Sequence, residues 1–475
     1  MPSQPYFGSG GSGSRFGGPP LESLPVEPLL TRDFEARPDA VYDRLRRLHG
    51  PVAPVGLLGV PAWLVLGYGE ALEVLQNERL WKRDIRHWRA RAEARLPADW
   101  PLRAGQEVRH MMFLDGEEHR LSRGTFETAL RPYQDPRAPQ ARQLRTAVLR
   151  HADELIGLLS GGGTAWEGFA DLCSQYSRPL PLMVINSLYG FHTDHGDEVV
   201  MDIWRMLDGG PDAHEAVGRL LAAMTSLAAA KQQLPGDDLT SRMLAADPSL
   251  SAEQLGRELF MIAVYLSDVT SNLISNTALE VIRGNRGVRV SLSAGLIGET
   301  VNRAAMANPP VANMTFRFPV QDVWMGNYCL RAGDIVVPSI AAAHRDPVFS
   351  SAVSSDATVS TRAHLAWGAG PHQCPGSARE LAGVIVTTAV GRLFERFSSL
   401  ELTLPPDQLP WRAAHIIRGL RSLPVRYVCS AAPEGSVRPA GAAGPAAPAA
   451  EPEPSVPDER RKRSPLWRLL TSLRR

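Results

Sequence analysis

The feature that most constrains the fold is one long helical pattern from Ser251 to about Arg283. Ser251 and Gln254 have the spacing of a capping box, which marks the start of a helix. The pattern continues for about 30 residues, or roughly 45 Å at 1.5 Å per residue. Its middle, Leu259–Leu266 (LFMIAVYL), is apolar on every face, and such a helix belongs inside a protein. The sequence therefore predicts a large core around a central helix.

The rest of the chain predicts a mainly α fold with a small β-rich part. Helical periodicity dominates residues 100–285, whereas strand-forming residues and turns dominate residues 310–345. The chain has 475 residues, of which 44% are hydrophobic and 21% charged, so it can bury a large core. Length alone allows two or three domains, and the motifs decide between these numbers.

Cysteine use and charge exclude several classes of protein. Cys173, Cys329, Cys374 and Cys429 are far apart and form no C-x-x-C pair, which argues against a zinc site or a disulfide framework. The formal net charge of +1 gives no reason to expect nucleic acid as a partner. No apolar run reaches the roughly 18 residues of a membrane span, and the N-terminus lacks a signal-peptide pattern. We therefore expect a reduced, cytoplasmic protein.

Both ends of the chain differ in composition from its middle. Residues 1–20 are rich in Gly, Ser and Pro and predict a flexible tail, and residues 431–459 predict an extended Ala/Pro-rich linker. Residues 460–475 predict a basic amphipathic helix that docks weakly on anionic lipid at the membrane periphery or on an acidic protein. A disordered basic tail without a partner is the alternative. The apolar face of the helix would consist of Leu466, Trp467, Leu470 and Leu473.

The loop HLAWGAGPHQCPG, residues 364–376, carries the strongest chemical signal. Gly368 and Gly370 precede Cys374, and glycine lets the backbone come close to a flat macrocycle. A helix is predicted from about Ser377, and its N-terminus would lower the pKa of the thiol and strengthen the thiolate as an iron ligand. A lone cysteine is otherwise usually a small buried hydrophobic residue.

This loop resembles the cysteine-ligand loop of the cytochrome P450 family. The shared pattern is W-G-x-G-x-H-x-C-x-G, with Trp367 where the family usually has Phe. The resemblance covers about residues 25–430, and it implies a single large domain over residues 21–430. It also implies heme b as the cofactor, with the thiolate of Cys374 as the ligand of the iron.

Four further residues agree with the resemblance. His119 and Arg123 are four residues apart and share a helix face, from which they can form charge-assisted hydrogen bonds to an anion. The resemblance assigns both to the heme propionates, together with Arg317 and His372. For each residue alone, a solvated surface charge is the alternative.

The central helix departs from the family pattern. The family's oxygen-activation segment, A-G-x-[D/E]-T, corresponds here to Tyr265, Leu266, Asp268 and Val269. Leu266 places bulk where the family leaves room for dioxygen, and Val269 lacks the threonine hydroxyl. We predict that Asp268 and the adjacent Thr270 deliver protons. A polar pair buried for structural reasons is the alternative.

The E-x-x-R ion pair of the family is also missing from its expected place. When the sequence is aligned on Asn308–Asn313 (NPPVAN), the Glu position holds Arg303 and the Arg position holds Met306. A frame based on Glu299 places Asn302 at the arginine position. Some bacterial members are similar here, so the loss of this pair does not imply the loss of heme.

The resemblance implies a heme-thiolate monooxygenase that inserts oxygen from O2 into a small hydrophobic molecule. The chain has no flavin or nicotinamide fingerprint, so a ferredoxin-type protein is expected to supply the electrons. Two alternatives remain open because of the altered central helix. One is a catalytically impaired heme-binding protein with a regulatory or scaffold role, and the other is a peroxide-driven oxidase.

Overall fold

The structure is a computed structural model that describes residues 18–29, 31–97, 100, 109–160, 167–191, 193–208, 212–284, 288, 295–353, 361–412 and 416–430. The predicted linker and basic tail, and all but the last three residues of the predicted N-terminal tail, lie outside these ranges. Those three predictions therefore stay predictions. No helix among the described residues is both long and apolar enough to cross a membrane.

The predicted central helix is confirmed as α12, Ala252–Arg283. Ser251 is its N-cap, and both hydrogen bonds of the capping box with Gln254 are present. Gly284 ends the helix in a left-handed conformation, which glycine adopts at low cost. The helix is buried along most of its length, but Tyr265 and Leu266 are only partly buried, because they face a cavity.

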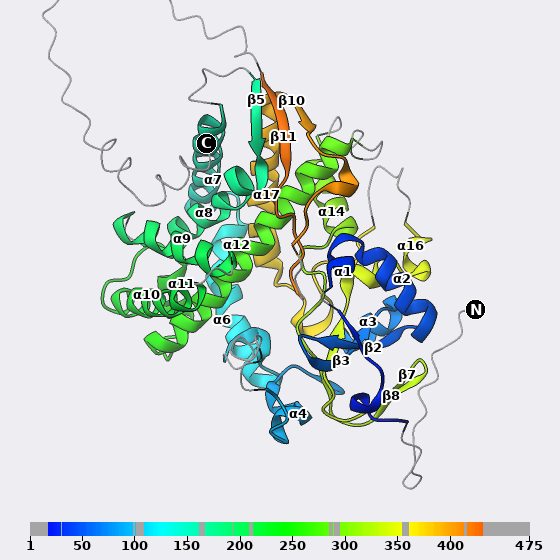
Figure 1. Cartoon of the computed structure of the whole chain (residues 1–475). Helices are drawn as coiled ribbons and strands as arrows, with labels where there is room; N and C mark the ends of the chain where they lie inside the picture. The colour runs from blue at the N-terminus through cyan, green and yellow to red at the C-terminus, as the bar shows by residue number, and fades with distance from the viewer. Residues whose placement is uncertain are drawn as a thin grey trace, which may run out of the picture.

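Helices surround α12 on several sides and form the larger core of the molecule. α12 packs against α8, α10, α14 and α17, and α17 also packs against α6 and α7. In Figure 1, α9, α10 and α11 lie to the left of α12, while β2, β3, β7 and β8 lie to its right. The helices around α12 are α6 (Gly116–Gln134), α7 (Pro139–Leu159), α8 (Pro179–Tyr189), α9 (Thr193–Asp208), α10 (Ala213–Gln233), α11 (Leu239–Ala246), α14 (Ile297–Ala307) and α17 (Gly376–Arg396).

The β-rich part is small, as predicted. A four-stranded sheet has the order β1-β2-β3-β9, in which β2 and β3 are antiparallel neighbours. A three-stranded sheet has the order β10-β11-β5, and β7 pairs with β8. The bounds are β1 (Glu27–Pro28), β2 (Val52–Leu57), β3 (Val60–Val65), β5 (Glu167–Asp171), β7 (Val323–Met325), β8 (Tyr328–Leu330), β9 (Val336–Pro338), β10 (Phe397–Leu402) and β11 (Pro424–Cys429).

One short strand pair positions residues of the site. β4 (Trp81–Lys82) pairs antiparallel with β6 (Phe318–Pro319), and Lys82 lies opposite Phe318. Arg83 follows β4 directly and Arg317 directly precedes β6, and both residues line one cavity. The pairing of the two strands therefore brings two arginines to one place.

Candidate functional site

Cys374 lies in a tight loop before α17 that only glycine residues permit. Gly368 and Gly370 have φ values of +74° and +70°, which are left-handed. A Cβ atom at Gly370 would also overlap the backbone carbonyl of Leu75. The backbone N–H of Cys374 donates to the carbonyl of Trp367 at 2.8 Å, which closes the loop. The backbone therefore holds the cysteine in one position.

The thiol of Cys374 lines a largely apolar cavity bounded by α6, α12 and α17. Burial raises the pKa of this thiol to about 11, so a thiolate here needs a strong positive charge beside it. The apolar walls include Phe126, Leu130, Met261, Leu266 and Val269. Of the other predicted site residues, the same cavity is lined by His119, Arg123, Thr270, Arg317 and His372.

His119 and His372 lie against each other at one side of this cavity, with ring centroids 3.8 Å apart. Burial, followed by the charge of Arg123, lowers the pKa of His119 to about 4. Burial also lowers the pKa of His372, as do the charges of Arg83 and Arg317. Both rings are therefore neutral near pH 7. The buried Nδ1 of His119 has no hydrogen-bond partner among the described residues.

Arg317 is a buried cation in the same group. Its Nη1 donates to the carbonyls of Thr315 and Phe316 at 2.9 and 3.1 Å. Burial, followed by the charge of Arg83, lowers its pKa, and no described acidic side chain forms an ion pair with it. A buried guanidinium without a counter-ion calls for an anion. With neutral imidazoles beside it and a thiol in the same apolar cavity, the set fits the propionates and the iron of heme.

Arg123 has a different set of contacts. Its Nη1 donates to the carbonyls of Gln373 and Pro371 at 2.6 and 3.1 Å, and its Nε donates to Glu127 at 2.9 Å. The guanidinium therefore ties α6 to the loop that carries Cys374. Its predicted contact with a propionate stays a prediction.

Asp268 and Thr270 lie on different faces of α12. Thr270 lines the Cys374 cavity, whereas Asp268 lines a separate cavity of about 20 Å³, room for roughly one water molecule. Asp268 accepts hydrogen bonds from Arg412 at 2.6 Å and from Asn272 at 3.2 Å. The buried carboxylate is thus paired, and its predicted role in proton delivery stays a prediction.

Glu299 on α14 has an arginine partner that the sequence pattern did not reveal. Arg362, which lies shortly before the cysteine loop, donates to both carboxylate oxygens of Glu299. Asn302, one turn along α14, contacts Nε2 of His364 at 2.7 Å and the carbonyl of Thr361 at 3.2 Å. The E-x-x-R pattern is absent from the sequence of this helix, and Glu299 forms an ion pair with Arg362 in the segment before the cysteine loop.

Sequence reasoning also missed Arg83, which lines the cavity and is only 6% exposed. The motif WKRD gave no signal for this residue. Arg83 follows β4 and Arg317 precedes β6, so the pairing of these strands brings the two residues to one cavity. Proximity between positions so far apart in the chain cannot be read from local patterns.

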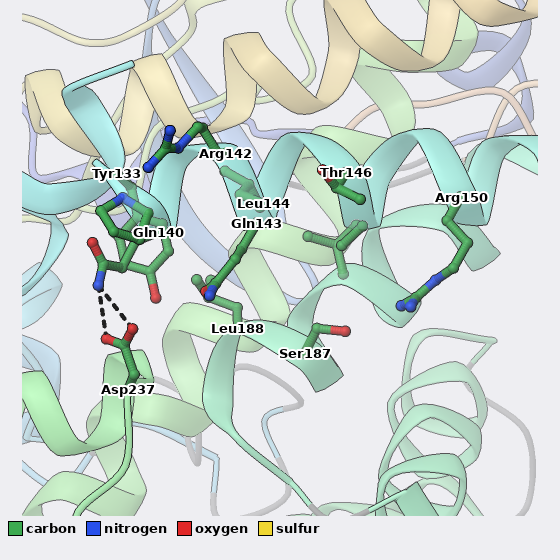
Figure 2. A pocket seen from close by; sticks show the side chains of 13 residues that line it. Tyr133, Gln140, Arg142, Gln143, Leu144, Thr146, Arg150, Ser187, Leu188 and Asp237 are labelled. Carbon is green, nitrogen blue, oxygen red and sulfur yellow. Dashed lines mark hydrogen bonds between the residues drawn. The ribbon is translucent and has the colours of Figure 1, made fainter. Parts of the chain in front are cut away.

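A second hollow, of about 590 Å³, opens on the surface between α7 and α8 (Figure 2). Gln140 reaches across it and donates to both carboxylate oxygens of Asp237, at 2.9 and 2.8 Å. Leu188 lines this groove and also the Cys374 cavity. The lining residues of the groove include neither cysteine nor histidine. The candidate chemistry therefore belongs to the Cys374 cavity.

Comparisons with known proteins agree with this geometry, although no protein-family model matches the chain. Cytochrome P450 107B1 of Saccharopolyspora erythraea is 32% identical over 379 residues, which cover 78% of this chain and 90% of that protein. The monooxygenase PikC of Streptomyces venezuelae is 30% identical over 84% of this chain and 93% of its own length. A structure of CYP154C4 from a Streptomyces species superposes with a TM-score of 0.74 at 28% identity, over 86% of this chain and 99% of that one. With this coverage and with Cys374 in its glycine-bounded loop, the chain belongs to the bacterial cytochrome P450 family and is a P450-type monooxygenase whose cofactor is heme b.

Proposed function

We propose that this protein hydroxylates a small hydrophobic molecule with oxygen from O2, using electrons from a ferredoxin-type donor in the cytoplasm. The observation that carries the proposal is the position of Cys374 in a largely apolar cavity lined in part by α12. Relatives named as hydroxylases of 6-deoxyerythronolide B and of vitamin D(3) support hydroxylation as the reaction. When bound, heme supplies dioxygen activation at an iron whose thiolate ligand donates electron density.

The chain's own residues have separate tasks in this proposal. Cys374 is the ligand of the iron, and Arg317 with His119 and His372 holds the propionates. The apolar side chains Met261, Leu266 and Val269 exclude bulk water and favour a hydrophobic substrate over a polar one. The tie between Arg123 and the carbonyls of the loop keeps the cysteine in position.

Protons reach the cavity by a divided route in this proposal. Thr270 supplies a hydroxyl at the cavity wall, where Val269 has none. Asp268 holds a proton-accepting carboxylate on the other side of α12, beside Arg412 and a space for one water molecule. In this proposal α12 separates the Thr270 hydroxyl, which faces the substrate cavity, from the Asp268 carboxylate, which faces the space for water.

The side chains of Tyr265 and Leu266 in the cavity wall are the reason for two alternative functions. These side chains occupy the helix positions where the family usually has Ala and Gly, and both line the cavity. If they exclude dioxygen, the protein would be a heme-binding regulatory or scaffold protein without turnover. If only proton delivery is impaired, hydrogen peroxide would support oxidation where ferredoxin and O2 do not.

The carbon monoxide difference spectrum of the reduced, heme-loaded protein tests the proposal. We expect a Soret band at the position of a thiolate-ligated heme, and the Cys374→His variant should lose that band. Turnover of a panel of hydrophobic compounds should then require ferredoxin, its reductase and O2. A thiolate band without any turnover would support the non-catalytic alternative, and turnover with peroxide alone would support the oxidase.

A further inference from the structure

Arg83 is a buried cation that the proposed function leaves without a task. It follows β4 and lines the Cys374 cavity at 6% exposure. Its buried Nε has no hydrogen-bond partner, and in the part of the chain that the structure describes no acidic side chain forms an ion pair with its guanidinium. Burying a charge in this way is costly unless an anion joins it.

The neighbourhood of Arg83 increases this cost. Arg317 lines the same cavity beside the paired ends of β4 and β6, and the charge of Arg83 lowers its pKa, so the two like charges repel each other. Asp115 is close, but its oxygens accept the backbone N–H groups of Arg83 and Asp84 at 2.8 to 3.1 Å. Burial lowers the pKa of Arg83 to about 10, and it still carries its charge near pH 7. Two buried guanidiniums therefore share one acid that is already bonded elsewhere.

Backbone contacts hold Arg83 in place before any ligand binds. The three hydrogen bonds to Asp115 fix the chain at positions 83 and 84. Asp115 is itself the N-cap residue of α6, so the arginine is tied to a long helix as well as to β4. Because the backbone at Arg83 is fixed, only its side-chain torsions remain to be ordered when it binds a ligand.

Tyr265 supplies a second donor to the same part of the cavity. It lies on α12 and lines the cavity, and the charge of Arg83 acts on its hydroxyl. Burial raises the pKa of this phenol to about 12, so the hydroxyl keeps its proton and can donate it in a hydrogen bond. A guanidinium beside a hydroxyl donor suits a carboxylate.

Arg123, another arginine of the site, does not compete for this role. The guanidinium of Arg123 is bonded to Glu127 and to the carbonyls of the cysteine loop. Heme carries two carboxylates, and the single guanidinium of Arg317 can form a bidentate ion pair with only one of them. A second carboxylate, or the acid group of a substrate, would satisfy Arg83.

We infer that Arg83 and Tyr265 form a carboxylate-binding position in the wall of the Cys374 cavity. The inference rests on the proposed function, because the carboxylate belongs either to the second propionate of heme or to an acidic substrate bound beside it. Both sources offer Arg83 a carboxylate. If the carboxylate belongs to heme, the loss of Arg83 impairs heme retention; if it belongs to the substrate, the loss impairs binding of the acid.

The test compares wild-type holoprotein with Arg83→Gln, Tyr265→Phe and the control Arg86→Gln. Arg86 is a fitting control because its side chain is 66% exposed and pairs with Asp84 outside the cavity. One arm follows the Soret band while a scavenging globin removes heme. In the other arm, each holoprotein is titrated with dodecanoic acid and, separately, with dodecanol, and the Soret shift reports binding. Losing a hydrogen bond to a charged group should raise either the rate of heme loss or the dissociation constant of the acid roughly tenfold or more, depending on which carboxylate Arg83 binds.

Each outcome decides between the sources or against the inference. Faster heme loss in Arg83→Gln with an unchanged preference for the acid assigns the carboxylate to heme. Unchanged heme loss with a lost preference for the acid assigns it to the substrate. If Arg83→Gln and Tyr265→Phe match Arg86→Gln in both arms, the inference is wrong. If Arg83→Gln does not fold, Tyr265→Phe, which removes one oxygen atom, decides the question alone.

The carbon monoxide spectrum of the wild-type protein keeps the two hypotheses apart. A wild-type protein without the thiolate band would overturn the proposed function itself. A normal wild-type band together with unaffected variants would overturn only the role of Arg83 and Tyr265.

Discussion

Gly370 shows how strongly a single residue constrains the site. Its φ of +70° costs an L-residue about 1–2 kcal/mol, and a Cβ atom there would overlap the carbonyl of Leu75. We therefore expect Gly370→Ala to lower the free energy of unfolding by more than about 2 kcal/mol and to weaken heme binding. Thermal melting and heme content would measure both effects. Gly124→Ala is the control, because Gly124 lies within α6 with open space around its Cα. A Gly370→Ala protein as stable as this control would contradict the prediction.

The separation of Asp268 from Thr270 also leads to a prediction at the residue scale. If both deliver protons, Asp268→Asn and Thr270→Val should each slow turnover driven by ferredoxin and O2 by about 100-fold or more, as is typical for losing an acid–base group. Turnover driven by peroxide should fall less, since peroxide brings its own protons. Substrate oxidation under both conditions is the measurement.

Asp268 also has a structural role, and the design must separate the two. Its ion pair with Arg412 is largely buried, and breaking such a pair costs up to about 3–5 kcal/mol. Arg412→Ala is the matched variant, because it breaks the pair and keeps the carboxylate. If Arg412→Ala slows turnover as much as Asp268→Asn does, the carboxylate acts through stability and delivers no proton.

At the scale of elements, His344 joins α14 to the start of the cysteine loop. Its Nδ1–H donates to the carbonyl of Met306 at 2.9 Å, and its Nε2 accepts from the N–H of Leu365 at 2.8 Å. The second bond requires a neutral ring, because a protonated Nε2 cannot accept a hydrogen bond. Burial lowers the pKa of His344 to about 4, and the pKa of the neighbouring His364 falls to about 4 for the same main reason.

This lowered pKa predicts a loss of stability in acid. The unfolded ring takes up a proton near pH 6.5, whereas the folded ring stays neutral down to about pH 4. The contribution of His344 to stability is therefore complete above pH 6.5 and falls between pH 6.5 and 4, by roughly 3 kcal/mol in all. Urea unfolding at several pH values should show a shallower fall for His344→Asn. Identical pH profiles would rule out this role for the histidine.

The elements that sequence could predict are those set by local patterns. Ser251, Gln254 and the apolar run after them are neighbours in the chain, so α12 and its start were predicted correctly. The glycine spacing around Cys374 likewise predicted a close backbone approach. Arg83 and Arg362 act through β4–β6 pairing and through a contact with Glu299, and such contacts between distant positions have no local signal. The sequence therefore predicted α12, the cysteine loop and four polar residues of the cavity, His119, Arg123, Arg317 and His372, but it missed Arg83 and the partner of Glu299.

At the scale of the whole molecule, the Cys374 cavity lies where the helical core meets the β-rich part. α6, α12 and α17 supply one side, and residues from the ends of β4 and β6 supply Arg83 and Arg317. A ligand that binds only the folded state raises stability by mass action. Removing heme should therefore lower the melting temperature, and Cys374→Ala should reduce this difference. Equal melting temperatures with and without heme would mean that the cofactor does not join the two parts.

The predicted tail at residues 460–475 concerns the whole molecule, because it would decide where the heme domain works. The predicted helix would combine arginines with an apolar face that includes Trp467. We expect the full-length protein to sediment with vesicles of anionic lipid more than a form that ends at residue 459, and salt should weaken this binding because it screens charge. Trp467→Ala should weaken it while keeping the charge, and vesicles of zwitterionic lipid are the control. Equal sedimentation of the full-length and shortened proteins would exclude the membrane, and an acidic protein would then be the partner to test.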